Sequence, residues 1–185
     1  MPAFEYLAHN QWAFTEKVDG TNIRVYVKEG NVRFGGKTDN AQIPTRLLTA
    51  LDDLFTPKHD ALLASFKDAD VCLYGEGYGA KIQKGGGLYR QDQGFVLFDI
   101  RIGQWWLQRE DIEEIAGRLG IDIVPIVGHG TLDDMVDRVR SGFDSQWGGF
   151  AAEGIVARST VELQTRGGER IITKIKAKDF AVQGR

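Results

Sequence analysis

Alternation of apolar and polar residues near the N-terminus predicts a β-hairpin. Ile23 to Val27 alternates with the period of a strand, and the pattern resumes from Val32 to Phe34 after Glu29-Gly30-Asn31, whose composition favours a tight turn. The apolar runs 71–74 and 95–102 predict two buried strands. The residues between these two runs are rich in glycine and polar side chains, so a surface loop is expected there.

Three other segments have the apolar spacing of amphipathic helices. Pro44 can open the first, Gly120 can end the second, and Thr131 is a credible N-cap for the third, with Asp134 three residues later. The apolar positions are Leu47, Leu48, Leu51, Leu54 and Phe55 in the first helix, Ile112, Ile115, Ala116 and Leu119 in the second, and Leu132, Met135, Val136 and Val139 in the third.

The remaining pattern is that of strands. Residues 121–127 predict a strand between the second and third helices. Near the C-terminus, 154–158, 161–165 and 170–176 predict strands, with a turn at Gly167-Gly168 before the last. No internal repeat or long linker divides the chain. We therefore expect a single α+β domain over residues 1–185, with mostly antiparallel sheets flanked by helices.

Composition narrows the class of protein without identifying it. Of the 185 residues, 42% are apolar and 26% charged, and no apolar run approaches the roughly 20 residues of a membrane span. No secretory signal is evident, and the single cysteine, Cys72, fits a reducing compartment, so a cytoplasmic protein is expected. The net charge is −3, but residues 158–185 hold seven Lys or Arg against three acids. This basic segment is either a phosphate-facing surface or an ordinary solvated hairpin.

The most informative segment for chemistry is Glu16-Lys17-Val18-Asp19-Gly20-Thr21-Asn22. In an extended chain Lys17 and Asp19 point to the same side, and Gly20 permits a turn or a close approach to a ligand. A short K-x-D-G pattern also arises by chance on exposed strands. Other segments add weight to the functional interpretation.

Carboxylates and lysines recur at the ends of later strands. Glu153 precedes the apolar run that starts at Gly154, and Glu76 lies among glycines at the end of another run. Lys174 and Lys176 alternate with apolar residues, so both should point to one face and could bind an anion. Each residue also has an ordinary explanation, such as solvation of a strand end, or core packing for Phe95 and Phe98.

Taken in order, these segments resemble the covalent nucleotidyltransferase superfamily of polynucleotide ligases and capping enzymes, from Glu16 to Lys176. Asn22 after Gly20-Thr21, and the run Phe95 to Ile100, are most similar to ATP-dependent RNA ligases. The resemblance implies the nucleotidyltransferase fold, similar to that of ATP-grasp enzymes, and an enzyme that joins RNA ends.

The resemblance also implies a role for each matching residue. Lys17 would become linked to AMP, Glu153 would help to hold the catalytic metal, and Phe98 would stack on adenine. A basic residue after the first hairpin would contact the nucleotide phosphate, and Lys37 is the preferred candidate for that position, with Arg33 as the alternative. The implied catalytic set is Lys17, Asp19, Glu153, Lys174 and Lys176, and the implied nucleotide-binding set is Glu16, Val18, Gly20, Asn22, Lys37, Glu76 and Phe98.

General chemistry adds a requirement. A free lysine has a pKa near 10.4, so roughly four in ten thousand are neutral nucleophiles at pH 7. Attack on phosphorus therefore needs help from nearby positive charge, and Lys174, Lys176 and a divalent cation could supply it. With carboxylate and water oxygens as the candidate ligands, Mg²⁺ or Mn²⁺ is expected.

The sequence also departs from the fuller members of this superfamily. Only nine residues follow Lys176, so neither an OB-fold nor another C-terminal nucleic-acid-binding domain is expected in this sequence. A partner could supply it, and Lys81, Lys84 and the basic segment 158–185 are candidate contacts for RNA ends, a nicked duplex or an RNA/DNA hybrid. A compact DNA ligase, a guanylyltransferase and a catalytically silent end-binding module remain alternatives.

Overall fold

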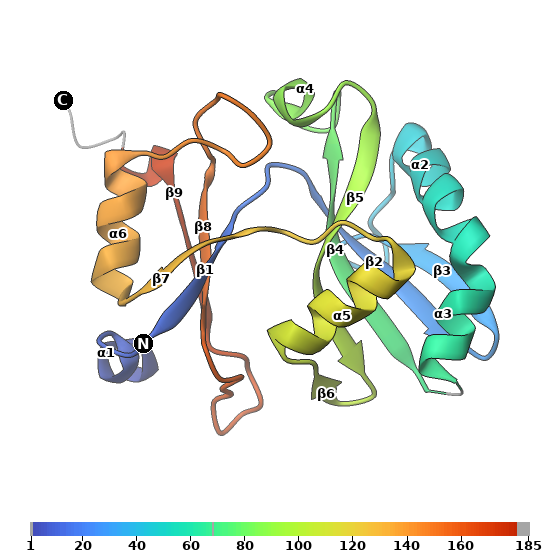
Figure 1. Cartoon of the computed structure of the whole chain (residues 1–185), viewed down its shortest axis with the longest axis horizontal. Helices are drawn as coiled ribbons and strands as arrows, with labels where there is room; N and C mark the ends of the chain where they lie inside the picture. The colour runs from blue at the N-terminus through green and yellow to red at the C-terminus, as the bar shows by residue number, and fades with distance from the viewer. Residues whose placement is uncertain (1, 68, 181–185) are drawn as a thin grey trace. The chain divides into compact units, whose positions relative to one another are not determined.

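The computed structural model describes residues 2–67 and 69–180, which form two compact units. Within these described residues, unit 1 comprises 2–18 and 124–180, and unit 2 comprises 19–67 and 69–123. Each unit has its own antiparallel sheet with helices packed on it, which confirms the predicted α+β class (Figure 1). The prediction of a single domain over 1–185 stays a prediction.

Unit 2 is built on a five-stranded sheet with the order β3-β2-β4-β5-β6. Its strands are β2 (Thr21–Lys28), β3 (Asn31–Gly35), β4 (Val71–Gly79), β5 (Gln93–Ile102) and β6 (Trp105–Trp106). Its helices are α2 (Thr45–Phe55), the 3-10 turn η1 (Thr56–Lys58), α3 (His59–Phe66), α4 (Gly86–Tyr89) and α5 (Arg109–Leu119). One face of the sheet, which includes Val25 and Leu73, forms a core with Leu47, Leu51 and Phe55 of α2.

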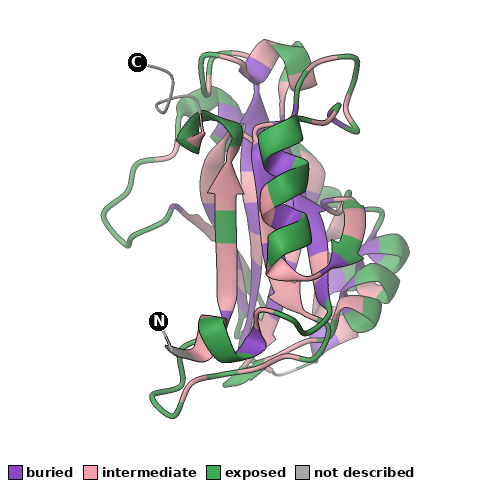
Figure 2. Cartoon of the chain, turned by 90° about the vertical axis from the view of Figure 1, so that its left-hand side faces the viewer, coloured by how far each residue is buried: buried purple, intermediate pink, exposed green. Residues whose placement is uncertain are grey.

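Unit 1 is built on a four-stranded sheet with the order β7-β1-β8-β9. Its elements are α1 (Pro2–Leu7), β1 (Trp12–Glu16), β7 (Ile126–Gly130), α6 (Leu132–Ser141), β8 (Gly154–Ser159), β9 (Ile172–Lys176) and the 3-10 turn η2 (Ala177–Asp179). The core surrounds Trp12 and Phe14 of β1, and α6 contributes Met135 and Val139 while its outer side is exposed (Figure 2).

Most of the predicted elements are confirmed. The hairpin forms as β2 and β3, and the three amphipathic helices form as α2, α5 and α6. Gly120 ends α5 in the left-handed conformation at φ 60°, and Thr131 and Asp134 form the capping box of α6. Leu48 is the exception among the apolar positions of α2: it is 39% exposed, because it lies beside the buried stripe rather than on it.

Four predictions about local structure are wrong. The predicted loop after residue 74 begins as strand, since β4 continues to Gly79, and Gly86 is buried at the start of α4. Between α5 and α6, strand pairing of 121–127 is limited to a single bridge at Ile123 until β7 begins at Ile126. In residues 161–165, β-pairing is limited to the isolated bridge of Gln164 with Arg170. The last strand starts at Ile172 rather than at residue 170.

Membrane insertion through a helix has no support in the described ranges. None of the helices within residues 2–67 and 69–180 combines the length and apolar character needed to span a bilayer.

Candidate active site

Backbone pairing in unit 1 brings Lys17, Glu153 and Lys176 to one end of its sheet. Lys17 directly follows β1, and its N–H donates to the carbonyl oxygen of Gly154 at 2.9 Å. Gly154 opens β8 opposite Lys176, the last residue of β9. A Cβ on Gly154 would lie 2.0 Å from the carbonyl oxygen of Ile175, so only glycine allows this close pairing. The strand ends therefore fix where the three charged side chains start.

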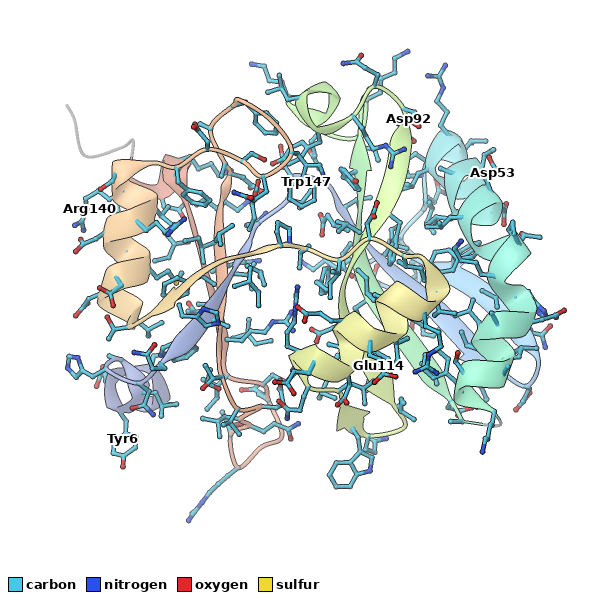
Figure 3. All side chains as sticks on the ribbon, viewed as in Figure 1. Tyr6, Asp53, Asp92, Glu114, Arg140 and Trp147 are labelled. Atoms are coloured by element: carbon cyan, nitrogen blue, oxygen red, sulfur yellow. The ribbon has the colours of Figure 1, made fainter. Side chains whose placement is uncertain are left out.

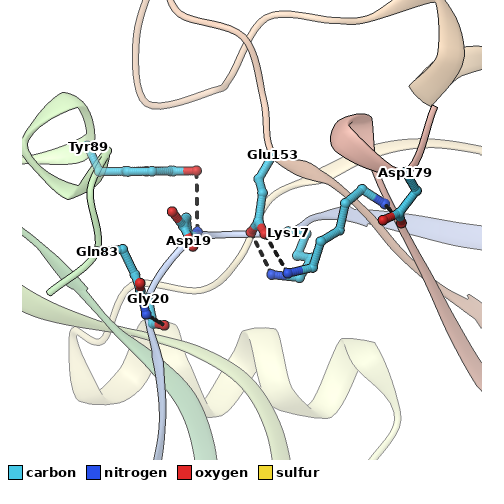
Figure 4. A network of polar contacts seen from close by, with 8 residues as sticks. Lys17, Asp19, Gly20, Gln83, Tyr89, Glu153 and Asp179 are labelled. Carbon is cyan, nitrogen blue, oxygen red and sulfur yellow. Dashed lines mark hydrogen bonds and ion pairs between the residues drawn. The ribbon is translucent and has the colours of Figure 1, made fainter. Parts of the chain in front are cut away.

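Glu153 joins the two lysines through its carboxylate (Figure 4). Lys17 Nζ donates to Glu153 Oε2 at 2.5 Å, and Lys176 Nζ lies 2.9 Å from Glu153 Oε1. The side chains of Lys17 and Glu153 are each 16% exposed, so these charge-assisted contacts are partly shielded from water. One carboxylate thus serves two ammonium groups, which leaves the cluster with excess positive charge.

Lys174 adds a third cation on the same strand. It lies two residues before Lys176, so strand alternation places both on one face of β9. Lys174 is exposed and forms no ion pair with any residue in the described part of the chain. A carboxylate also lies nearby, because Asp179 Oδ2 accepts a hydrogen bond from the backbone N–H of Lys176 at 2.9 Å. The cluster can still receive an anion, since Lys174 has no counter-ion among those residues.

Glu16 has a contact that sequence reasoning missed. Its side chain is only 1% exposed, and its two oxygens accept hydrogen bonds from Ser145 Oγ at 2.5 Å and from the backbone N–H of Gln146 at 2.8 Å. Ser145 Oγ in turn accepts from the N–H of Trp147, which is labelled in Figure 3. Glu16 therefore anchors the loop before Glu153. Its assignment to the nucleotide stays a prediction, and no sequence spacing indicated this buried contact.

In unit 2, side chains form hydrogen bonds with the backbone of Asp19 and Gly20, the residues that follow Lys17 and Val18. Tyr89 Oη accepts a hydrogen bond from the N–H of Asp19 at 3.3 Å, and Gln83 Nε2 donates to the carbonyl oxygen of Gly20 at 3.0 Å (Figure 4). A Cβ on Gly20 would lie 2.3 Å from the carbonyl oxygen of Gly77. The glycine of the K-x-D-G pattern is thus required by packing against β4. Val18, the last residue of unit 1, is 4% exposed, so its side chain belongs to the packed interior.

Asn22 and Glu76 are direct cross-strand partners on β2 and β4. Neighbouring side chains of such a pair start about 5 Å apart on one face, so the predicted nucleotide contacts of these two residues can act together. Glu76 lies within β4 rather than at its end, which corrects its predicted position.

Strand register separates the two candidates for the phosphate contact. Arg33 pairs with Tyr26, four residues along β2 from Asn22, or roughly 13 Å away. Lys37 lies two residues after Gly35, the last residue of β3, and Gly35 pairs with Arg24 of β2. Continued at the same register, Lys37 would fall opposite Asn22. Lys37 itself lies in a bend beyond β3, so its place beside Asn22 and Glu76 stays a prediction.

Phe95 and Phe98 differ in environment although both lie on β5. Phe95 is buried in the core and meets Phe55 edge to face at 5.4 Å between ring centroids. Phe98 is the extra residue of a β-bulge, because β4 pairs Tyr74 with Asp99 and the next residue with Leu97. It is partly exposed and belongs to neither hydrophobic core. Core packing thus accounts for Phe95, and Phe98 retains an accessible ring.

The donor set for a metal ion is small. The described residues contain no group of three or more His, Cys, Asp or Glu side chains that could hold a metal. Glu153 fits a different arrangement, in which one carboxylate and the substrate phosphates share a Mg²⁺ or Mn²⁺ ion that keeps several waters. In this structure both Glu153 oxygens are taken by lysines, so such an ion must compete with Lys17 and Lys176.

The candidate nucleic-acid contacts are dispersed. Lys81 and Lys84 are both exposed. The basic segment 158–185 includes β9 and the lysines described above, but its last residues, 181–185, with Arg185, lie outside the described part of the chain.

Comparisons with known proteins agree with this fold. The model of the RNA ligase family matches residues 10–176. Naegleria gruberi RNA ligase with PPi gives a TM-score of 0.74 at 19% identity, covering 99% of this chain and 54% of that one. A variant of the same ligase with ATP and Mn gives 0.73 at 19% identity over 97% of this chain and 52% of that one, and a variant with AMP and Mn gives 0.75 at 18% over 97% and 53%.

These structural likenesses are too low in identity to show more than the fold. The chain spans about half the length of the solved structures it matches. No curated protein shows significant similarity to this sequence.

Proposed function

This chain belongs to the RNA ligase family, and on that premise we propose that it carries out ATP-dependent RNA ligation through a covalent Lys17–AMP intermediate. The observation that carries the proposal is the shared carboxylate of Glu153, which contacts both Lys17 and Lys176 at one end of the unit 1 sheet. Lys17 is partly buried beside further cations, which can bind a triphosphate and bring it within reach of this nucleophile.

The proposed cycle has three steps. Lys17 Nζ loses a proton and forms a bond to the α-phosphorus of ATP while the bond to pyrophosphate breaks. The oxygen of an RNA 5′-phosphate then attacks that phosphorus, the bond to Lys17 breaks, and AMP is carried on the RNA end. Finally a 3′-hydroxyl attacks the activated 5′-phosphate, the joining phosphodiester forms, and AMP leaves.

The Lys17–Glu153 ion pair represents a resting arrangement in this proposal. An ammonium group has no lone pair, so Lys17 must lose its proton and its contact with Glu153 before it can attack phosphorus. Triphosphate oxygens would compete for Lys174 and Lys176. Glu153 is the residue that would hold Mg²⁺ or Mn²⁺, which supplies charge neutralisation for the phosphates and for departing pyrophosphate.

Residues of unit 2 take the nucleoside in this proposal. Phe98 offers a partly exposed ring for adenine, and the cross-strand pair of Asn22 and Glu76 offers polar groups for the ribose. Lys37, favoured over Arg33 by register, contacts the phosphate. The ATP, AMP and Mn named with the Naegleria gruberi structures support the choice of ATP and a divalent ion as cofactors.

The whole reaction on RNA ends is part of the proposal, because the chain spans about half of the ligases it matches. Engagement of the RNA by a further domain or a partner protein is compatible with it.

The first step can be tested by the intact mass of the protein after incubation with Mg²⁺ and ATP. We expect a gain of one AMP, about 329 Da, that is lost in Lys17→Ala. Lys58→Ala, which removes a lysine from η1 of unit 2, is the matched control and should keep the adduct. Protein must first be freed of AMP acquired during expression. A GMP adduct from GTP would instead indicate a guanylyltransferase, and no adduct with either nucleotide would contradict the proposal.

A further inference from the structure

A row of five residues, four of them charged or aromatic, crosses the unit 2 sheet from one edge to the other. Each residue is the direct partner of the next in the strand pairs β3–β2, β2–β4, β4–β5 and β5–β6 (Figure 1). In order, these are Arg33, Tyr26, Cys72, Arg101 and Trp106. We call them the cross-sheet row. Their neighbours Val25 and Val27 point into the hydrophobic core, so alternation places the row on the opposite face of the sheet.

This face is hollowed over the row. A cavity of about 680 Å³ is lined by its first four members and by residues of the β2–β3 hairpin. The floor is Cys72, a small and buried side chain between Tyr26 and Arg101. Burial raises the pKa of the Cys72 thiol, which keeps the floor uncharged at neutral pH.

Two arginines that line the cavity are available to bind an anion, because the acidic residues of the cavity pair with other cations. Arg24 pairs with Asp39 at 2.9 Å, and Lys28 pairs with Asp70 at 2.8 Å, so these two carboxylates of the cavity are already engaged. The third, Glu29, lies 4.0 Å from Lys28. By contrast, Arg33 is exposed, Arg101 is partly exposed, and neither forms an ion pair with the residues that the structure describes.

Each aromatic member lies beside an arginine. The guanidinium carbon of Arg101 lies 5.8 Å from the ring centroid of Trp106, and that of Arg24 lies 5.3 Å from the ring of Tyr26. Arg33 and Arg101 are separated by three strand spacings, or roughly 14 Å. The row therefore alternates groups that bind phosphate with flat rings, over a length that exceeds one nucleotide.

We propose that the cross-sheet row binds a single-stranded segment of the RNA substrate. Arg33 and Arg101 contact backbone phosphates, and Tyr26 and Trp106 provide surfaces on which unpaired bases stack. The proposal rests on the RNA ligase function proposed above and extends it by naming where unit 2 contacts RNA. Two arginines without an ion pair among the described residues favour a polyanion, and the interleaved rings favour one that carries exposed bases.

The experiment measures binding of a fluorescent single-stranded RNA with a 5′-hydroxyl, by anisotropy over a range of salt concentrations. This RNA cannot accept AMP, so binding is read without ligation. The test variant is Arg33→Ala with Arg101→Ala, and the matched control is Arg46→Ala with Arg118→Ala, which removes two exposed arginines from α2 and α5 of the same unit.

We expect the test variant to lower affinity at least about tenfold at low salt. Its slope of log affinity against log salt should be shallower by about 1.4, because each phosphate that an arginine no longer neutralises reduces the slope by about 0.7. The single variant Arg33→Ala should reduce the slope by about half as much. Because Arg33 is exposed on an edge strand, this variant should fold normally and keeps the test valid if the double variant misfolds. The control variant, Arg46→Ala with Arg118→Ala, should keep the wild-type affinity and the wild-type salt slope.

Base stacking has its own readout. Tyr26→Ala should lower affinity about fivefold or more without changing the salt slope, and Tyr26→Phe should restore it, since the ring is retained. Equal loss in Tyr26→Ala and Tyr26→Phe would contradict stacking by this ring. If the test variant lowered the affinity for duplex RNA as much as the affinity for single-stranded RNA, the choice of a single strand would be overturned.

The outcome is separable from the test of the ligase function. If the test and control variants bound the RNA with the same affinity, the proposal that the cross-sheet row binds RNA would be overturned, even if Lys17 forms its AMP adduct. Row-dependent binding without an adduct would support the row and contradict the ligase mechanism.

Discussion

The two units hold their candidate functional residues in different ways. In unit 1, side chains contact one another: Glu153 joins Lys17 and Lys176, and Glu16 anchors the loop at Ser145. In unit 2, backbone pairing sets the positions, as it does for Asn22 with Glu76 and along the cross-sheet row. A change to one side chain in unit 1 should therefore disturb its partners, whereas the arrangement of the residues in unit 2 should change chiefly when the backbone moves.

The largest effect is expected from Glu153→Ala. This variant leaves Lys17 and Lys176 without their shared carboxylate and removes the candidate metal ligand. We expect the rate of AMP attachment to Lys17 to fall about 100-fold or more, on the scale of lost transition-state stabilisation. The initial rate is measured by intact mass, and circular dichroism confirms that the fold is kept.

Glu169→Ala is the matched control for Glu153, because Glu169 is an exposed glutamate of the same unit. It should keep the wild-type rate. An equal rate in Glu153→Ala and Glu169→Ala would show that the contacts of Glu153 serve stability alone.

A smaller effect, on stability, is expected from Gly20→Ala in unit 2. The added Cβ would lie 2.3 Å from the backbone oxygen of Gly77, and a strand cannot yield as a flexible side chain can. We expect the free energy of unfolding to fall by about 1–3 kcal/mol, the usual cost of overpacking. Urea unfolding measures it, with Gly85→Ala as control because a Cβ there meets nothing within 4 Å. If both variants had equal stability, packing would not explain the glycine of this pattern.

The same contrast explains what could be predicted from the sequence. Helices with a regular apolar stripe, such as α5 and α6, are predictable because their period follows from one local pattern. The strand predicted at 161–165 is wrong, because strand formation depends on a distant partner that no local pattern contains. The sequence did not predict β1 as a strand for the same reason: it pairs with β7 and β8, more than 100 positions away.

The candidate site divides in a similar way. The order of the motifs indicates Lys17, Glu153 and Lys176, and the structure brings these three residues together. The buried contact of Glu16 with Ser145 joins positions 129 residues apart, so no local spacing could indicate it. The sequence already favours Lys37 over Arg33, and the register of β2 with β3 adds only that Arg33 pairs with Tyr26, away from Asn22.

The smallest effect is expected at the N-terminus of α6 in unit 1, where a capping box has no counterpart on α5 of unit 2. Asp134 accepts hydrogen bonds from the backbone N–H and the hydroxyl of Thr131, and the backbone contact is the main reason that the pKa of Asp134 is lowered. Gln108, at the N-cap of α5, makes no side-chain cap contact. The folded state of unit 1 therefore prefers the ionised form of Asp134.

A carboxyl group with a lowered pKa stabilises the fold above its unfolded pKa, and this contribution disappears as pH falls through the folded pKa. We therefore expect Asp134→Asn to be less stable than wild type near pH 6, with the difference shrinking below about pH 4. Urea unfolding between pH 3 and pH 6 measures this difference. Asp133→Asn removes a neighbouring charge outside the capping box, so a similar pH-dependent difference there would mean that general charge near the helix start, and not the contact with Thr131, is responsible.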